Sequence, residues 1–214
     1  IHVPLSEEAR AEALVMMLGS HNILGPKDGK PIVTPGQDMV MGNFYLTMEE
    51  TKQELLEESQ RYMDADCPKE AAAWKRYALN EGHVYSDVDE VMLAYQTGQV
   101  HLHSRIALPV KGMNKTSFNP VHENDYLITT VGKIIFNDMF PADFPYINEV
   151  SKENFEETPA RYFVKPGEDI KAYIEQLPIV DAVKKKDLGK VIAEVFKRYP
   201  VDETAEILDQ IKAK

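Results

Sequence analysis

The chain has 214 residues, 43% of them hydrophobic, so it can bury one large core or two smaller ones. Its formal net charge of −11 argues against gripping a nucleic-acid backbone by itself, because phosphate neutralisation requires clustered Lys and Arg. Its apolar runs are far shorter than the roughly 20 residues that cross a bilayer. The single cysteine, Cys67, has no metal-ligand spacing around it and favours a reducing, cytoplasmic location.

Both ends of the chain have the character of internal sequence. Ile1 is not preceded by an initiator Met, and no secretory signal pattern follows it. Lys214 lies inside an amphipathic helical pattern without a stop signal. We therefore expect a piece of a longer protein.

The first predicted elements are a helix and a β-hairpin. Ser6, followed by two glutamates, is a predicted N-cap for a helix that runs to about Leu18. The pair Asp28-Gly29 between apolar arms is a strong turn signal and predicts a hairpin over residues 23–33.

Two further helices are predicted from capping-box patterns. The first begins at Thr47 and runs to about Tyr62, with Leu55 and Leu56 on its inner face. The second begins at residues 86–89 and ends before Gly98. The stretch between them, residues 64–82, shows no decisive pattern.

Two strands follow, and then helices dominate. Residues 100–110 alternate with period two, which predicts a half-buried strand, and residues 125–130 predict a second strand leading into a helix that breaks at Pro141. Apolar residues at helical spacing over 188–199 predict a helix with Asp187 as N-cap, and a second helix starts near Asp202. The expected fold class is α+β: mixed strands, hairpins and short helices in residues 1–145, and a mainly helical part in 146–214.

Two clusters of side chains could carry metal chemistry. His101 and His103 would share one face of a strand and could bind zinc, but no third ligand is identifiable nearby, so exposed polar positions are the favoured interpretation. Asp87, Asp89 and Glu90 could hold a divalent cation, but the capping box explains the same residues. The residues alone therefore predict no metal site and no active site.

Four segments in chain order resemble the largest, β′-type subunit of RNA polymerase. They are residues 1–17, residues 21–42, residues 129–137 with Phe144-Pro145-Tyr146, and residues 188–212. The last has a form typical of Gram-positive bacteria. The resemblance covers nearly the whole chain and is weakest over 64–82 and 150–187. It implies a pore, or secondary-channel, region in residues 1–145 and a helical segment leading to the funnel in 146–214.

The resemblance implies that this chain lacks the catalytic centre. In that family, nucleoside triphosphates are joined to an RNA 3′ end by a two-metal mechanism, with Mg²⁺ held by the aspartates of an Asn-Ala-Asp-Phe-Asp-Gly-Asp loop. That loop would lie immediately before Ile1. We therefore expect no catalytic residue, no metal and no cofactor in this chain, and no activity from it alone.

The resemblance also implies candidate site residues. The family's pore hairpin, expected to carry Gln37 and Asp38, lines the secondary channel through which nucleotides enter and a backtracked RNA 3′ end is extruded. Gln37 is the first candidate, because an amide offers both donors and an acceptor to a passing triphosphate. Asn22 and Asp38 follow, with backbone capping around the hairpin as the alternative. Lys133 stands where the family usually has Arg and lacks its bidentate fork.

The partners implied are the β, α and ω subunits and the rest of β′. Nucleoside triphosphates, the RNA 3′ end and transcript-cleavage factors would enter the channel, and DNA would be bound only through the whole enzyme. Two alternatives stay open. One is a self-standing acidic protein–protein interaction domain that docks through its terminal helices. The other is a small metal-dependent hydrolase built on His101 and His103.

Overall fold

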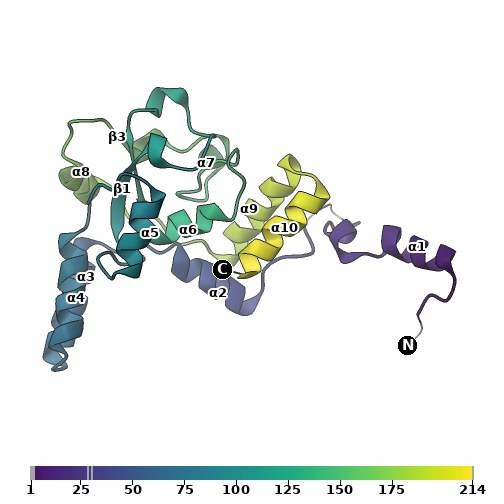
Figure 1. Cartoon of the computed structure of the whole chain (residues 1–214), viewed down its shortest axis with the longest axis horizontal. Coiled ribbons are helices and arrows are strands. Elements are labelled where there is room, and N and C mark those ends of the chain that lie inside the picture. Colours follow the sequence, from purple (N-terminus) through teal and green to yellow (C-terminus); the bar gives the residue numbers. More distant parts are fainter. Residues whose placement is uncertain (1–2, 28, 30, 214) are drawn as a thin grey trace. The chain divides into compact units, whose positions relative to one another are not determined.

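The structure is a computed structural model that describes residues 3–27, 29 and 31–213 (Figure 1). The chain divides into two compact units, Ile1–Met41 with Lys184–Lys214, and Gly42–Val183. Its helices and one three-stranded antiparallel sheet confirm the α+β class. The division at residue 145, drawn from sequence, stays a prediction. Within the described ranges, no helix has the length and apolar character needed to span a membrane.

The sheet lies in the Gly42–Val183 unit and has the order β1-β2-β3. Its strands are β1 (Arg105–Pro109), β2 (Tyr126–Thr130) and β3 (Phe163–Val164). The register pairs Arg105 with Thr130 and Tyr126 with Val164. The second predicted strand is confirmed at β2.

The first predicted strand is only half correct. Residues 100–104 form turns, and β1 begins at Arg105. The expected half-buried character is also wrong, because Ile106, Ala107 and Leu108 are all completely buried. β1 is paired at both edges: β2 lies along one edge, and Val84 forms a parallel bridge to Ala107 on the other. Its faces are covered by packing, because Ile106 and Leu108 belong to the main core and Ala107, which alternates with them, is equally buried.

Helices α3 (Lys52–Asp64) and α4 (Pro68–Leu79) form an antiparallel pair (Figure 1). The capping box that starts α3 uses Thr51 and Glu54, so the predicted start at Thr47 is wrong by four residues. Leu55 is buried as expected, whereas Leu56 is exposed. The pair packs through small groups, including a hydrogen bond from Ser59 Oγ to the Ala71 carbonyl (2.8 Å).

Helix α5 (Val88–Gln96) begins one residue later than its capping pattern suggested. Asp87 is the N-cap and accepts a hydrogen bond from the Glu90 N–H (2.8 Å), while the Ser86 N–H donates to Glu90 Oε2 (2.6 Å). Asp87 and Glu90 therefore make the reciprocal contacts of a cap. The capping interpretation of this acidic cluster is confirmed.

Helix α6 (Val131–Asp138) follows β2 directly, with Thr130 as its N-cap, and ends before Pro141 as predicted. Its second residue requires glycine, because a Cβ on Gly132 would lie 1.9 Å from the Leu46 carbonyl oxygen. The short helices α7 (Lys152–Glu156) and α8 (Ile170–Gln176) complete this unit. The main core is formed by strand, helix and loop residues, among them Tyr85, Val91, Ile106, Leu108, Leu127, Val131, Ile134, Tyr146, Tyr162 and Phe163.

In the other unit, α1 (Glu7–Met16) has Ser6 as its N-cap, as predicted, and a short 3-10 helix, η1 (Gly19–Asn22), follows. The predicted hairpin is reduced to one antiparallel bridge between Leu24 and Pro31. Asp28, half of its turn signal, lies outside the described residues. Helix α2 (Gln37–Leu46) comes next, and the boundary between the two units falls within it, after Met41. Gln37 and Asp38 are therefore on a helix, and their expected place on a hairpin is wrong.

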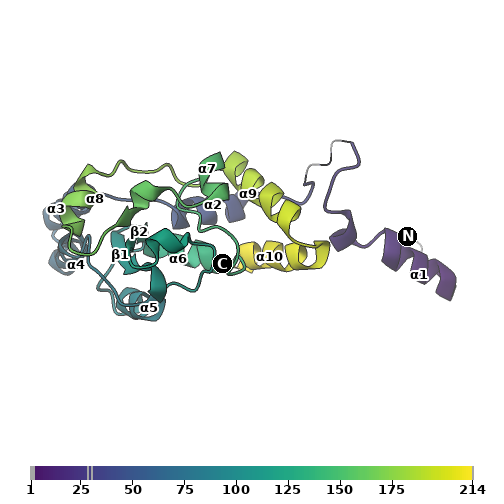
Figure 2. The same ribbon diagram turned by 90° about the horizontal axis from the view of Figure 1, so that it is seen from above.

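The predicted C-terminal helices are α9 (Lys185–Arg198) and α10 (Val201–Ala213), which lie side by side (Figure 2). The periodic residues of α9 from Leu188 to Val195 are buried, as are Ile207 and Ile211 of α10. The N-cap position of α9 is Lys184, so the prediction of Asp187 as N-cap is wrong; Asp187 lies in the first turn.

Candidate functional site

The three residues predicted for the channel lie at element ends. Gln37 and Asp38 occupy the first turn of α2 and are both exposed, and the backbone of Gln37 has φ +39°. This left-handed conformation is uncommon for a residue with a side chain. Gln37 therefore presents its amide to solvent from a constrained turn.

Asn22 has a backbone contact of its own. Its Nδ2 donates to the carbonyls of Met16 and Leu18, both at 3.0 Å. These bonds join the end of α1 to η1, so Asn22 caps backbone, as the alternative interpretation required, although outside the hairpin. Among the described residues, no hydrogen bond or ion pair connects Asn22 with Gln37 or Asp38.

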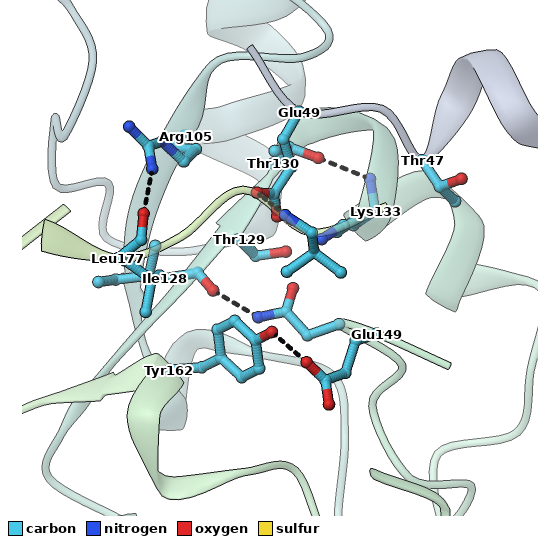
Figure 3. Close-up of polar contacts among 12 residues, drawn as sticks. Thr47, Glu49, Arg105, Ile128, Thr129, Thr130, Lys133, Glu149, Tyr162 and Leu177 are labelled. Atoms are coloured by element: carbon cyan, nitrogen blue, oxygen red, sulfur yellow. Dashed lines mark hydrogen bonds and ion pairs between the residues drawn. The ribbon is translucent and has the colours of Figure 1, made fainter. Parts of the chain in front are cut away.

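A residue in the first turn of α6, Lys133, belongs to a buried ion pair. The Lys133 ammonium pairs with Glu49, and the two side chains are only 3% and 4% exposed (Figure 3). Burial lowers the pKa of Lys133, and the charge of Glu49 opposes that effect. Sequence reasoning noted Lys133 only as a substitution for Arg. Nothing in the local sequence indicated Glu49, which is 84 residues away.

The segment 177–183 is attached to this region through its backbone. The Val180 N–H donates to Glu49 Oε2 (3.2 Å), and the Val183 N–H donates to Thr47 Oγ1 (2.9 Å). Arg105 donates from Nη1 to the Leu177 carbonyl (3.1 Å), as Figure 3 shows. Three side chains from distant parts of the sequence therefore hold one extended segment against the sheet.

Arg105 also takes part in a second buried ion pair. Its Nε and Nη2 lie 2.9 and 2.8 Å from the same carboxylate oxygen of Glu81. The other oxygen of Glu81 accepts the Lys52 N–H at the start of α3 (3.1 Å). Burying these two charges costs desolvation energy, which their mutual attraction and their further hydrogen bonds offset. This group positions backbone and offers no nucleophile or general base to solvent.

Glu149 accepts a hydrogen bond from the Tyr162 hydroxyl (2.6 Å), as Figure 3 shows, and it also pairs with Arg161. Burial and the neighbouring Glu149 carboxylate raise the pKa of Tyr162. Deeper in the core, Thr129 Oγ1 and the Tyr146 hydroxyl are hydrogen-bonded (2.8 Å). These contacts stabilise the loops between α6 and β3.

The two histidines singled out from the sequence do come together, but in a buried turn. His103 is 1% exposed, and its Nδ1 lies 3.5 Å from Glu50 Oε1, while His101 Nδ1 lies 3.2 Å from Glu50 Oε2. Burial raises the pKa of the Glu50 carboxyl, but the two imidazoles outweigh it and hold the value at about 2. Glu50 is the third metal-type ligand that sequence reasoning missed.

Comparison with known proteins decides the family. Residues 22–214 match the family model described as RNA polymerase Rpb1, domain 3. The chain is 47% identical over 213 residues to the DNA-directed RNA polymerase subunit β′ of Bacillus pumilus, covering 99% of this chain. The β′ subunits of Bacillus subtilis and Listeria monocytogenes are 46% and 48% identical over the same length. The chain belongs to the RNA polymerase Rpb1 domain 3 family.

The chain spans 16% of the length of these β′ relatives. The match to the Rpb1 domain 3 model includes Asn22, Gln37 and Asp38, and also the buried pair of Glu49 with Lys133. The resemblance stated from sequence motifs is thereby confirmed. In this chain, the charged groups of the two buried pairs, Arg105 with Glu81 and Lys133 with Glu49, are withdrawn from solvent, and the exposed candidates are at the start of α2.

Proposed function

We propose that this chain forms part of the secondary channel of a DNA-directed RNA polymerase, where nucleotides enter and a backtracked RNA 3′ end leaves. The observation that carries the proposal is the exposure of Gln37 and Asp38 in a chain that matches the RNA polymerase Rpb1 domain 3 family from residue 22 onward. The polymerisation chemistry would rest on Mg²⁺ held by residues outside this chain.

The groups inside the chain are consistent with a shaping role. The metal-ligand cluster found among the described residues contains two imidazoles and one carboxylate. Mg²⁺ prefers oxygen ligands in octahedral geometry, so this cluster does not fit the catalytic ion. The buried pairs of Lys133 with Glu49 and of Arg105 with Glu81 supply rigidity.

An exposed amide suits a channel wall. Gln37 can donate to a phosphate oxygen or accept from a ribose hydroxyl without a fixed charge that would retain the triphosphate. Asp38 beside it carries a negative charge, which repels anions and so disfavours their retention at the wall. Asn22 has a lesser part in the proposal, because its amide nitrogen already serves the carbonyls of Met16 and Leu18.

The test is a reconstituted polymerase carrying Gln37→Ala in β′. We expect the KM for nucleoside triphosphates or the rate of backtracked-RNA cleavage to change by about two- to tenfold, the size of one lost hydrogen bond. Gln96→Ala, at an exposed glutamine of α5, is the matched control and should leave both unchanged. If the two variants behave alike, Gln37 is not a channel contact.

The interaction-domain alternative is not favoured, because the β′ match extends over 99% of the chain. If the chain serves in β′, its partners are the β, α and ω subunits and the remainder of β′. Co-purification of the intact β′ subunit with these partners, with and without residues 37–46, would test that assembly separately from the channel contacts.

A further inference from the structure

The cluster of Glu50, His101 and His103 is built by backbone pairing between two distant segments. The Glu50 N–H donates to the His103 carbonyl (3.1 Å), and Glu50 forms a parallel bridge to Ser104. This pairing holds the residue just before the N-cap of α3 against the turn just before β1. The backbone pairing therefore brings the carboxylate of Glu50 close to both imidazoles.

The ligand atoms have the spacing of a metal site. One donor atom from each of the three residues lies within 4.8 Å of the others. His101 Nδ1 lies 3.2 Å from Glu50 Oε2, and His103 Nδ1 lies 3.5 Å from the other carboxylate oxygen, Oε1. Ligands about 2.0–2.1 Å from a tetrahedral ion are about 3.3 Å apart, so the observed spacing needs little adjustment.

Several of these buried atoms lack hydrogen-bond partners. Neither ring nitrogen of His103 makes a hydrogen bond of good geometry within the described parts of the chain, and neither does Glu50 Oε2, although ion-pair distances of 3.2 and 3.5 Å join the carboxylate to the two rings. His101 Nδ1 accepts a long hydrogen bond, 3.5 Å, from the His103 N–H, and it also lies 3.2 Å from Glu50 Oε2. In either neutral tautomer, His103 buries an unused lone pair. Such groups are costly unless a partner is supplied.

The surroundings hold both rings in place. Trp74 and Tyr77 lie against His101, with ring centroids 4.7 and 5.4 Å away, and Tyr45 meets His103 edge-on at 4.6 Å. The two imidazoles are nearly perpendicular to each other, at 89°. A preorganised pair of imidazoles loses little freedom when it binds an ion.

We propose that Glu50, His101 and His103 bind one Zn²⁺ ion. Two nitrogen ligands and one carboxylate oxygen are a donor set that zinc accepts, whereas Mg²⁺ and Ca²⁺ require mostly oxygen. A water molecule would complete the tetrahedron. The ion would fasten the start of α3 to the turn before β1, far from Gln37 in sequence and independent of the channel contact proposed for that residue.

The test is titration of the chelator-treated 214-residue chain with Zn²⁺ by calorimetry, together with the absorption spectrum of the Co²⁺ form. We expect about one equivalent to bind, intense visible bands of a four-coordinate Co²⁺ ion, and a higher melting temperature with Zn²⁺. Absence of binding would overturn the proposal.

Variants locate the ion. Glu50→Gln and His101→Gln each keep the size of a partly exposed side chain. Each should weaken Zn²⁺ binding at least about tenfold, because even the loss of a supporting outer ligand costs about 10–100-fold. His83→Ala, an exposed histidine beside Tyr85, should bind as the parent does. Circular dichroism of the metal-free variants checks their folding. Unchanged affinity in both Gln variants would place the metal elsewhere and refute the site.

Discussion

Lys133 and Glu49 form an ion pair almost entirely withdrawn from solvent, although 84 residues separate them in the sequence. Glu49 also receives the Val180 N–H, so the pair joins α6, the residues after α2 and the segment 177–183. The carboxylate thus serves as both counter-ion and backbone acceptor. Removing either charge leaves the other buried and unpaired.

Lys133→Met should lower the free energy of unfolding by about 3–5 kcal/mol, the usual cost of breaking a buried pair. Lys133→Arg, which keeps the charge, should cost less. Chemical denaturation measures both. Lys69→Met, at an exposed position of α4, is the control and should stay within about 0.5 kcal/mol of the parent. Adding Glu49→Gln to Lys133→Met should recover part of the loss.

Gly132→Ala should be among the most damaging single-methyl changes in the chain. The new Cβ would lie 1.9 Å from the Leu46 carbonyl oxygen, so backbone must shift, at a cost of about 3 kcal/mol. Gly189→Ala is a matched change in helix α9 with no atom within 4 Å. It should instead stabilise by about 0.5–1 kcal/mol through helix propensity. Equal thermal shifts in the two variants would contradict the packing at Gly132.

Thr47→Val tests the attachment of the segment 177–183. The hydroxyl accepts the Val183 N–H and donates to the Asn43 carbonyl (2.8 Å), so an isosteric apolar side chain leaves a buried donor unsatisfied. The expected loss of stability is about 1–3 kcal/mol. Amide hydrogen exchange at Val183 should accelerate. Thr97→Val, at the exposed C-cap of α5, should leave the exchange at Val183 unchanged.

Lys115 should make stability depend on pH in the alkaline range. Burial lowers the pKa of its ammonium to about 8, partly offset by Asp138 and Asp143. Between this value and the ordinary 10.5, the unfolded chain binds the proton and the folded chain does not, so stability from this group rises with pH. Below pH 8 both states are charged, and the burial penalty of about 3 kcal/mol is constant.

Lys115→Met should flatten that rise between pH 8 and 10.5, as measured by denaturation at a series of pH values. The substitution also removes hydrogen bonds from Nζ to the carbonyls of Phe140 and Pro141 (2.9 and 2.8 Å). That loss lowers stability at every pH and does not change the slope. An identical slope in Lys115→Met and the parent would show that Lys115 does not titrate as proposed.

Elements with a strong local signal could be predicted from the sequence. The apolar period of α9 and the break after α6 at Pro141 are properties of neighbouring residues, so they survive in any context. The start of α3 could not be decided in this way. Thr47 and Thr51 each precede a glutamate by three residues, and only the tertiary contact of Thr47 with Val183 assigns the cap to Thr51.

The sites show the same limit. The exposure of Gln37 agrees with the role inferred from family resemblance, but its helical setting was missed because residues 37–42 carry no clear helical period. Glu50 could not be grouped with His101 and His103, since a parallel bridge between distant segments leaves no mark in local spacing. Helix α4 was missed because alanines, rather than large apolar residues, form its buried face.

The segment 177–183 is held through main-chain groups of Leu177, Val180 and Val183, while the side chains that hold it are Arg105, Glu49 and Thr47. The backbone path of this segment is therefore set by side chains that lie elsewhere in the sequence. We expect homologues to vary at an exposed position of the segment such as Ile179. We expect them to keep the three side chains that bind its backbone, those of Arg105, Glu49 and Thr47. The conformation of this segment is in effect encoded by residues that precede it by more than seventy positions.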